Sequence, residues 1–524
     1  GWHGPSFGYI DITETEVIVT AKNLNSGKAK GIHGIPISVL TKNVEILAPT
    51  SVSLFNKAFH AGTYPEILKI AKVTQIYKTG NQNELNNYRP ISVLSCINTL
   101  FEKLLAMRVK NFLHKNGILS PDQHGFQKTK STLSAVLSVT DVINEALNNN
   151  QFAIGVFLDI RNAFDTVHFE ILSQKLERYG FRGQSLQFFK SCLNGRYQRV
   201  VIYKHVSNLR PVDAGVPQGS VLGPILFTLY INDLTNGLSR VSAVMYVDDT
   251  ALVFTTPSLH TAAHILNDEL LKISEWFTTN RLTLNTDKTK YIVFKSPCKP
   301  VDFTMGKLKI NDKEIDKVGR ISYLGVMLDD ALNWRPHLGT LGKKLSSVCF
   351  TLTKARQHFE TDILRTIYFS LFQSQITYCI ECGGLTYHTY IKHIICLQKR
   401  ALRIINHVST RTPSQPLFSK TAIMPVPTLR DYRITLLVYK IICNNFPFPR
   451  TIFQTTGKSS RSASEGKFLI PLSHNTYGQR RLKYAGVKVW NDLPSSVLQS
   501  TRVDQALKAF FLHHTTSSLS KNQK

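Results

Sequence analysis

The sequence predicts an α+β fold, in which a mixed body of strands and helices is followed by a helical region. Two apolar runs flank the adjacent acids Asp248 and Asp249, which is typical of a β-hairpin with the acids at its turn. The run Phe152 to Leu158 is apolar throughout, as in a strand buried on both faces. After about residue 340, apolar residues recur at helical spacing.

The mixed body shows further elements in order along the chain. The Gly/Lys-rich stretch Ser26 to Gly34 is expected to be a loop, and helical spacing follows it at Leu40, Val44, Leu47, Val52, Phe55 and Phe59. Strands are predicted over Lys72 to Tyr77, Tyr291 to Phe294 and Ile321 to Val326, with a polar loop over Thr79 to Asn87. A helix is predicted over Thr166 to Tyr179, ended by Gly180 and capped by Asp165-Thr166.

The helical region contains two apolar stripes and a break. Ile363, Ile367 and Leu371 begin one stripe that continues to Ile376, and residues 391–405 form another. Four prolines within residues 413–427 predict a linker. The tail Thr515 to Lys524 is polar and is expected to be disordered.

Net charge points to a polyanionic partner. The 524 residues carry 63 Lys and Arg against 35 Asp and Glu, a formal net charge of +28. From Leu341 to Lys524 there are 26 basic against 7 acidic residues, so most of the excess lies at that end. Nucleic acid is the partner that such an excess most often indicates. Neither a signal peptide nor a basic amphipathic anchor is recognisable, and no membrane partner is expected.

Eight cysteines are scattered without a disulfide-like framework, which indicates a reducing, intracellular compartment. The spacing Cys379-x2-Cys382, with His388, His393 and Cys396 downstream, could also hold zinc. These residues fall in helix-like sequence, and the interval from Cys382 to His393 is long. Cysteines packed in or between helices are therefore the favoured interpretation.

Acidic residues at two strand ends suggest a metal site. Asp159 ends the buried strand, and Asp248 lies at the predicted hairpin turn. Two adjacent like charges are costly unless a cation lies against them, and carboxylate oxygens suit hard cations such as Mg2+. Two such ions could activate a hydroxyl and stabilise a leaving phosphate, which is most of what phosphoryl transfer requires. A solvated Asp-Asp turn is the alternative for this tetrapeptide taken alone.

Six blocks of sequence in order resemble the reverse transcriptases of non-LTR (LINE-type) retrotransposons, of the Jockey-like group. The resemblance runs from about Gly27 to Leu493. A single block is weak evidence for this family, whereas six blocks in order are strong evidence. The blocks are Asn87-Tyr88-Arg89-Pro90-Ile91-Ser92, residues 157–165 (FLDIRNAFD), residues 215–224 (GVPQGSVLGP), Tyr246-Val247-Asp248-Asp249, Asn285-Thr286-Asp287-Lys288-Thr289-Lys290 and Tyr323-Leu324-Gly325. Leu397 to Arg403 and Val489 to Pro494 extend the resemblance.

The resemblance implies roles for the acids. Asp159 and Asp248 would be the metal ligands, with Asp249 a third carboxylate and the backbone carbonyl of Ile160 a further ligand. The cofactor would be two Mg2+ ions, with Mn2+ a possible substitute. An N-cap is the structural alternative for Asp159, but Asp165-Thr166 fits that position better.

The resemblance also implies substrate contacts. Lys78 and Arg89 would grip the triphosphate of the incoming dNTP, and Lys288 would help to protonate the leaving pyrophosphate. Phe164 resembles the steric gate against a 2′-hydroxyl, and Gln218 would contact the nucleotide. Leu324 and Gly325 would form the primer grip. The structural alternatives are solvated surface charge for Lys78, Arg89 and Lys288, core packing for Phe164 and a tight turn for Gln218.

Some positions depart from the family pattern. The segment Gly125 to Thr132 has Gln127 and Lys128 where Arg is usual, and Val247 replaces the more typical Ala. The upstream endonuclease domain expected in this group is not seen in the chain, so target cleavage is not assigned. Whether Gly1 is the native start, and which RNA and insertion target are used, stays open.

The resemblance implies a right-hand polymerase with fingers, an antiparallel-sheet palm and a helical thumb. The expected divisions are an N-terminal extension (1–34), fingers (35–150), palm (151–339), thumb (340–412), a C-terminal basic region (413–514) and a tail (515–524). Its partners would be an RNA template, a DNA primer or target and dNTPs, within the cytoplasm and nucleus; oligomeric state stays open. RNA-directed DNA synthesis is the expected activity. A catalytically inactive nucleic-acid-binding remnant and an RNA-dependent RNA polymerase are the alternatives.

Overall fold

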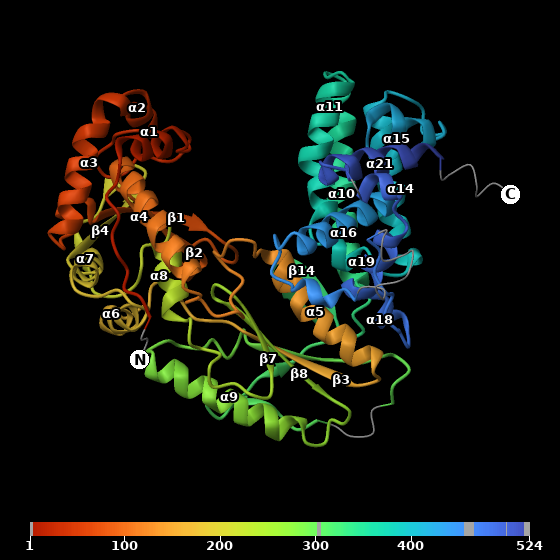
Figure 1. The fold of residues 1–524 in the computed structure, drawn as a ribbon, viewed down its shortest axis with the longest axis horizontal. Helices are drawn as coiled ribbons and strands as arrows, with labels where there is room; N and C mark the ends of the chain where they lie inside the picture. Colours follow the sequence, from red (N-terminus) through yellow and green to blue (C-terminus); the bar gives the residue numbers. More distant parts are fainter. Residues whose placement is uncertain (1–3, 301–304, 455–465, 499, 518–524) are drawn as a thin grey trace. The chain divides into compact units, whose positions relative to one another are not determined.

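The computed structural model describes residues 4–300, 305–454, 466–498 and 500–517. Its contacts divide the chain into two units, each built from segments that are separate in the sequence (Figure 1). Unit 1 contains Gly1–Phe126, Asp159–Leu238 and Leu270–Asn285, and unit 2 contains the remaining segments, Gln127–Leu158, Ser239–Glu269 and Thr286–Lys524. Both units mix helices with mainly antiparallel strands, so the predicted α+β class is confirmed at that level.

Unit 1 is built around a five-stranded sheet with the order β2-β1-β4-β5, and β6 pairs with β4. The strands are β1 (Ile70–Tyr77), β2 (Tyr88–Val93), β4 (Arg196–Ile202), β5 (His205–Val206) and β6 (Arg210–Val212). The helices are α1 (Glu14–Lys22), α2 (Ile37–Lys42), α3 (Val44–His60), α4 (Cys96–Lys115), α6 (Phe169–Arg178), α7 (Gln184–Leu193) and α8 (Gly223–Tyr230). Aromatic rings fill the space among the helices, with Phe55 stacked on Phe101 at 4.3 Å between centroids.

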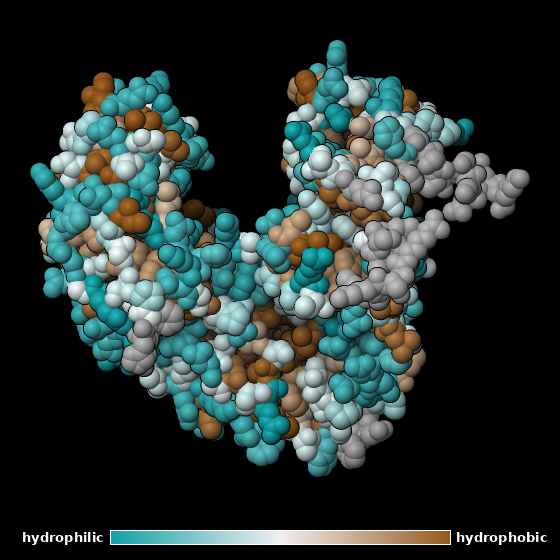
Figure 2. Space-filling model, viewed as in Figure 1, coloured by the Kyte–Doolittle hydropathy of each residue, from teal (hydrophilic) through white to brown (hydrophobic). Residues whose placement is uncertain are grey.

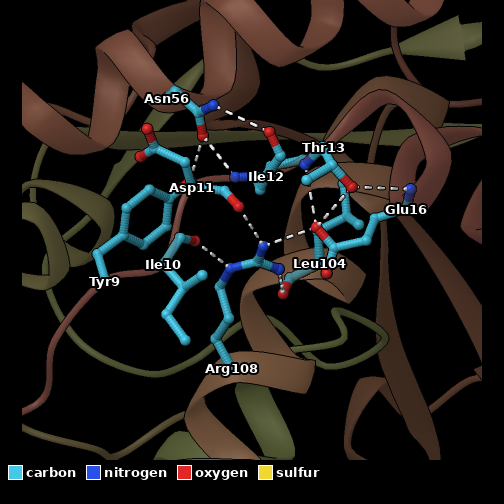
Figure 3. Close-up of polar contacts among 9 residues, drawn as sticks. All are labelled: Tyr9, Ile10, Asp11, Ile12, Thr13, Glu16, Asn56, Leu104 and Arg108. Carbon is cyan, nitrogen blue, oxygen red and sulfur yellow. Dashed lines mark hydrogen bonds and ion pairs between the residues drawn. The ribbon is translucent and has the colours of Figure 1, made fainter.

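The start of the described chain is fastened to α3 and α4 by polar contacts (Figure 3). Arg108, which is buried on α4, donates to the carbonyls of Ile10 and Asp11 and pairs with Glu16 at 2.8 Å. Tyr9 stacks on Phe59 at 3.7 Å. A buried guanidinium needs several acceptors, and residues 10–16 supply them, so this segment is part of the unit 1 core.

Unit 2 contains the sheet predicted around the acids, with the order β12-β9-β3-β8-β7. Its main strands are β3 (Phe152–Leu158), β7 (Ser242–Tyr246), β8 (Asp249–Thr256) and β9 (Lys290–Phe294), and β12 (Asp316–Lys317) pairs with β9. Strands β7, β8 and β3 lie side by side, with α5 (Thr132–Asn148) beside them (Figure 1). All seven residues of β3 are buried, which confirms the prediction from its unbroken apolar run.

Besides two short antiparallel strand pairs, one of them β10 (Lys309–Ile310) with β11 (Lys313–Glu314), the rest of unit 2 consists of helices that share one hydrophobic core with the sheet. They include α10 (Arg335–Ala355), α11 (Thr361–Ile367), a π-helical segment (Tyr368–Gln373), α12 (Ser374–Thr377), α13 (Ile380–Gly383), α14 (His388–Ile405), α15 (Gln415–Thr421), α16 (Val426–Ile442), α18 (Thr476–Arg480), α19 (Leu482–Asn491), α20 (Ser495–Leu498) and α21 (Val503–Ser517). Helix α9 (Ala262–Thr279) begins in unit 2 and ends in unit 1.

Three element predictions in unit 2 are wrong, each for a local reason. The single strand over residues 321–326 is a hairpin, β13 (Arg320–Tyr323) and β14 (Val326–Asp329), because Leu324 and Gly325 turn the chain with φ of +44° and +81°. The first stripe in the helical region is one residue out of phase. Tyr368 and Phe372 are buried, whereas Ile363 and Leu371 are 50% and 45% exposed, so the large aromatic rings took the core face.

The proline-rich stretch 413–427 is not a linker but the start of two helices. Pro416 and Pro427 occupy the first turns of α15 and α16, where a missing N–H costs nothing. In the predicted tail, residues 515–517 end helix α21, and residues 518–524 lie outside the described residues.

The visible surface is mostly hydrophilic, with apolar residues among the polar ones (Figure 2). Brown residues interrupt the teal around the helices α1 to α3, where Ile46 is 79% and Val19 54% exposed. Exposed apolar residues are common on folded proteins and need no separate explanation. In the described ranges, no helix combines the length and the apolarity that crossing a bilayer requires.

Candidate active site

Asp248 and Asp249 are exposed at the tip of the β7–β8 hairpin, as the sequence predicted. Tyr246 pairs with Asp249, so the turn consists of Val247 and Asp248, and Val247 adopts φ of +57°. A positive φ is rare for a β-branched residue and costs of order 1–3 kcal/mol. The side chain of Val247 is buried, which holds the turn in this shape and presents the two acids to solvent.

Asp159 directly follows β3, at the end of that strand that pairs with the start of β8. Leu158 pairs with Thr250, the last pair of β3 with β8, and Asp159 is the next residue along the chain. Two backbone hydrogen bonds hold the following segment in unit 1: Asn285 N–H donates to the Asp159 carbonyl, and Arg161 N–H donates to Thr283. Ile160, between them, pairs with Leu284 without using its own carbonyl in either bond.

The loop after Asp159 is bonded to the loop that contains Gln218, all within unit 1. Val216 N–H donates to the Phe164 carbonyl, and Gly215 N–H donates to Val167, both at 2.8 Å. The Gln218 side-chain amide donates to both carboxylate oxygens of Asp165 at 2.9 Å. The structure therefore brings together Phe164, Asp165 and Gln218, which the sequence placed in two separate blocks.

Asp165 is consequently not the helix cap that its position suggested. Helix α6 begins at Phe169, with His168 as its N-cap and without a side-chain capping bond. The Asp165 carboxylate instead accepts from Gln218. Partial removal from water raises the pKa of Asp165, and the hydrogen bond from Gln218 acts in the opposite direction.

Phe164 is half-buried, and its ring stacks on that of Phe227 with 4.8 Å between centroids. The contact fixes the ring while part of it stays accessible. Both the gate and the packing interpretations of Phe164 are compatible with this position.

Two glycines allow the Gln218 loop to approach its neighbours closely. Gly215 has φ of +88°, and a Cβ there would lie 2.8 Å from the Asp165 Cα. Gly219 has φ of +109°, and its Cβ would lie 2.9 Å from the Ser92 carbonyl oxygen. Ser92 N–H also donates to the Gln218 carbonyl at 2.7 Å, which ties the loop to β2. Only glycine is compatible with both the backbone and the contact.

Glu102 is a positioning residue that the sequence reasoning did not find. This glutamate on α4 is 2% exposed, and one carboxylate oxygen accepts from the N–H groups of Val221 and Leu222 at 2.6 and 3.3 Å. Its other oxygen accepts from Asn98 at 3.0 Å. In the sequence, the feature that could have indicated this role is the position of Glu102 as an acid inside the apolar helical stretch 96–106.

Lys78 and Arg89 stand at the end of the β1–β2 hairpin, both exposed. Arg89 pairs with Ile76, and the Lys78 N–H donates to the Asn87 carbonyl at 2.8 Å, so the two side chains share one face. The other face of this sheet lines a cavity of about 310 Å³ together with Asp165 and Gln218. The structure therefore does not place the two cations in that cavity.

The predicted primer-grip residues lie in unit 2 at the β13–β14 turn. The Tyr378 hydroxyl donates to the Leu324 carbonyl, and its ring lies 3.3 Å from where a Cβ on Gly325 would be. Burial, and then the negative charge of Asp249, raise the pKa of the adjacent Tyr323 well above its ordinary value. The Asp248-Asp249 turn and the Leu324-Gly325 turn therefore belong to one region of unit 2. Lys288 is exposed before β9.

The cysteine pair Cys379 and Cys382 is buried in the core of unit 2. Desolvation raises the pKa of Cys379 to about 12. Cys396, by contrast, is exposed on α14. Within the described residues, no three His, Cys, Asp or Glu side chains are grouped closely enough to hold a metal ion.

Comparison with known proteins finds one matching family and several similar proteins. Residues 76–328 match the family described as reverse transcriptase (RNA-dependent DNA polymerase). The chain is 28% identical over 401 residues to the probable RNA-directed DNA polymerase from transposon X-element of Drosophila melanogaster, covering 74% of this chain and 43% of that protein. It is 27% identical over 368 residues to the RNA-directed DNA polymerase from mobile element jockey of the same species, covering 67% and 39%. The chain thus spans less than half the length of these relatives.

Proposed function

Because residues 76–328 match the reverse transcriptase family, we propose that this chain is the RNA-directed DNA polymerase of a non-LTR retrotransposon. It would extend a primer 3′-hydroxyl on an RNA template. The observation that carries the proposal is the β7–β8 hairpin, which presents Asp248 and Asp249 next to β3, the strand that ends at Leu158 directly before Asp159. Reverse transcriptases place their metal-binding acids in blocks of this kind.

Asp159 and Asp248 are proposed to hold two Mg2+ ions, with Asp249 as a third carboxylate, although the described residues do not already group these three acids closely. The exposed carboxylates of Asp248 and Asp249, the half-buried carboxylate of Asp159 and the Ile160 carbonyl, which is not used in its β-bridge, are hard oxygen donors that suit Mg2+ and also Mn2+. When bound, these ions would supply activation of the primer hydroxyl and charge neutralisation at the leaving pyrophosphate. The protein positions the donors: the buried Val247 fixes the turn, and the bridge at Leu284 fixes the segment after Asp159.

The incoming nucleotide is proposed to meet residues from several blocks. Lys78 and Arg89 would contact the triphosphate, Phe164 would lie against the sugar, and Gln218 would contact the nucleotide from the loop that Glu102 positions. Lys288 would assist pyrophosphate departure. The close bonding of the Phe164 and Gln218 loops supports a shared role for those two residues.

A right-hand arrangement is proposed from the family. The fingers would come from residues 35–150, the palm from 151–339 and the thumb from 340–412, with a basic C-terminal region in 413–514. Leu324 and Gly325 would grip the primer from the β13–β14 turn. The excess of basic residues after Leu341 supports phosphate binding by the thumb and C-terminal region, so binding should weaken steeply with salt. A protein encoded by such an element would act in the cytoplasm and the nucleus.

Two rival functions differ in their products. An RNA-dependent RNA polymerase is disfavoured by Phe164 and by the Pro217-Gln218-Gly219 turn, whose Gln218 donates to the Asp165 carboxylate. An inactive nucleic-acid-binding remnant would bind RNA without extending a primer. The presence of all three acids at defined strand ends favours the active enzyme.

Primer extension on a generic RNA template tests the proposal. With Mg2+ and dNTPs, the protein is expected to extend a DNA primer, whereas Asp248→Ala should abolish extension and leave salt-sensitive RNA binding nearly unchanged. Glu275→Ala, which removes an exposed acid on α9 within the matched region, is the control for general loss of charge. Robust extension with NTPs, or full activity of Asp248→Ala, would overturn the assignment.

A further inference from the structure

A cavity of about 380 Å³ lies within unit 2, lined by helices α16, α18 and α19 and by residues 385–387 before α14. None of its lining residues is a proposed metal, nucleotide or primer contact. Most of the side chains around it carry a charge, a hydroxyl or an amide. Such a lining suits a polar ligand that is held by a few specific groups.

Arg480 lines this cavity as a buried cation with donors to spare. The residue is only 8% exposed. In the part of the chain that the structure describes, its guanidinium makes one hydrogen bond, from Nη1 to the Leu332 carbonyl at 3.0 Å. The next residue, Arg481, is also buried but pairs with both Asp141 and Glu145. Because buried charges are ordinarily paired, Arg480 has unused capacity for an anion in the cavity.

Two tyrosine rings hold the Arg480 guanidinium in place. Its Cζ lies 4.7 Å from the centroid of the Tyr387 ring and 5.3 Å from that of Tyr477. Tyr477 is itself buried, and its hydroxyl donates to the Ala331 carbonyl at 3.0 Å. A cation–π contact orients a guanidinium without using its N–H donors. The result is a preorganised fork, which suits a planar oxyanion.

The charges around the cavity favour an anion with a single negative charge. Arg430 and Asp431 pair with each other at 2.8 Å and contribute no net charge. Arg480 and Lys488 are then opposed by one acid, Asp492, which leaves one positive charge in excess. A carboxylate neutralises that excess. A phosphate monoester, with a charge of about −1.5 to −2, would leave surplus negative charge near Asp492.

Burial of Arg480 favours an anion at the end of a chain over one inside a polymer backbone. A phosphodiester carries a sugar on each side, and both sugars would have to enter the cavity for the phosphate to reach Arg480. They would also bring neighbouring phosphates towards Asp431 and Asp492. A carboxylate on a short aliphatic stem brings only its stem, as a glutamate side chain does.

We propose that this cavity, here called the Arg480 pocket, binds a glutamate side chain of a partner protein. Arg480 would donate to the carboxylate, and the exposed Lys488 would attract it. The proposal goes beyond the proposed polymerase, because it adds a protein partner to the nucleic acid. If Arg480 only fastens α18 to the Leu332 carbonyl, the cavity has no preference for a carboxylate.

Paired peptides test the Arg480 pocket. The full chain is titrated with two short end-blocked peptides that carry an uncharged dye and differ only in a central glutamate or glutamine. The unmodified chain is expected to bind the glutamate peptide about 10- to 100-fold more tightly, as for hydrogen bonds to charged groups. Arg480→Lys keeps the charge but loses the planar fork, so the preference should fall to about 2- to 5-fold.

Two exposed residues of the lining give shifts of opposite sign. Lys488→Gln should weaken binding of the glutamate peptide, and Asp492→Asn should tighten it, each by about 2- to 5-fold. The matched controls are Lys392→Gln on α14 and Asp362→Asn on α11, exposed residues outside the cavity that should leave binding unchanged. Thermal melts identify a folding defect in Arg480→Lys, and in that case the two exposed positions decide the test.

Equal binding of the two peptides by the unmodified chain would overturn the proposal. So would a preference for glutamate that Arg480→Lys retains in full, or shifts of equal size in the control variants. A phosphoserine peptide or a short oligothymidylate that binds more tightly than the glutamate peptide, and loses that advantage in Lys488→Gln, would assign the cavity to phosphate instead. The titrations contain no primer or dNTP, so their outcome is independent of the polymerase assignment.

Discussion

The side-chain amide of Gln218 donates to both carboxylate oxygens of Asp165, each at 2.9 Å. This contact joins the loop that follows Asp159 to the loop that precedes α8. Backbone bonds from Gly215 and Val216 reinforce the same junction. The position of Gln218 therefore depends on the loop that also carries Phe164, and a substitution in either loop should alter the conformation of the other.

Coupling between Asp165 and Gln218 can be measured directly. Asp165→Ala and Gln218→Ala should each raise the KM for dNTP, because hydrogen bonds to a charged group contribute about 1.5–3 kcal/mol. The double variant should cost less than the sum of the single changes, with a coupling energy of about 0.5–3 kcal/mol in kcat/KM. Asp165→Asn keeps an acceptor oxygen and serves as the conservative control. Additive effects would show that the contact does not position Gln218.

Phe164 should control the choice of sugar. Phe164→Val leaves space beside Phe227, so incorporation of NTPs relative to dNTPs should rise while dNTP incorporation falls less. The ratio of kcat/KM for the two nucleotides is the measurement. Phe164→Tyr, which keeps the ring, should preserve the discrimination. If Phe164→Val lowers both activities equally and also lowers the melting temperature, the ring has a packing role only.

Gly215 should tolerate no side chain. Alanine there would meet the Asp165 backbone at 2.8 Å in a left-handed conformation. The conformation costs about 1–2 kcal/mol, and the crowding adds about 1–3 kcal/mol. Gly117→Ala is a matched control in unit 1, since Gly117 has φ of +59° with no atom within 4 Å of the added Cβ. We expect a clearly larger drop in melting temperature for Gly215→Ala than for Gly117→Ala. Equal drops would exclude the close approach as its cause.

Acid should weaken unit 2 through the contacts of Glu145. Burial alone would raise the pKa of Glu145, but the hydrogen bond and charge of Arg481, together with Lys483, outweigh it and lower that pKa. The stabilisation is therefore present above the ordinary glutamate pKa of about 4.3 and is lost as pH falls through the lower, folded-state value.

Melting temperature as a function of pH measures this effect. Glu145→Gln should lower the melting temperature at neutral pH and flatten its decline below about pH 4.3. Glu177→Gln, an exposed acid on α6, is the control and should leave the profile unchanged. A wild-type profile in Glu145→Gln would show that the Arg481 contact contributes little.

Local sequence determined the strands and the turn that carry the acids. An unbroken apolar run can be satisfied only by burial on both faces, so Phe152 to Leu158 was predictable as an interior strand ending at Asp159. Two apolar runs around Asp248 could pair only as a hairpin of nearest neighbours. The order of the sequence blocks predicted, without reference to the fold, the family whose model matches residues 76–328.

Contacts between distant segments were decided by the tertiary structure alone. Which face of α11 and of the π-helical segment after it is buried depends on where the aromatic rings of Tyr368 and Phe372 fit, and the apolar spacing predicted the wrong face. The bond of Asp165 to Gln218 and the cross-strand pair of Lys72 with Arg199 join residues far apart in the chain. Sequence patterns record which residues favour burial or turns, whereas the parallel register that sets two cations side by side exists only after the strands have paired.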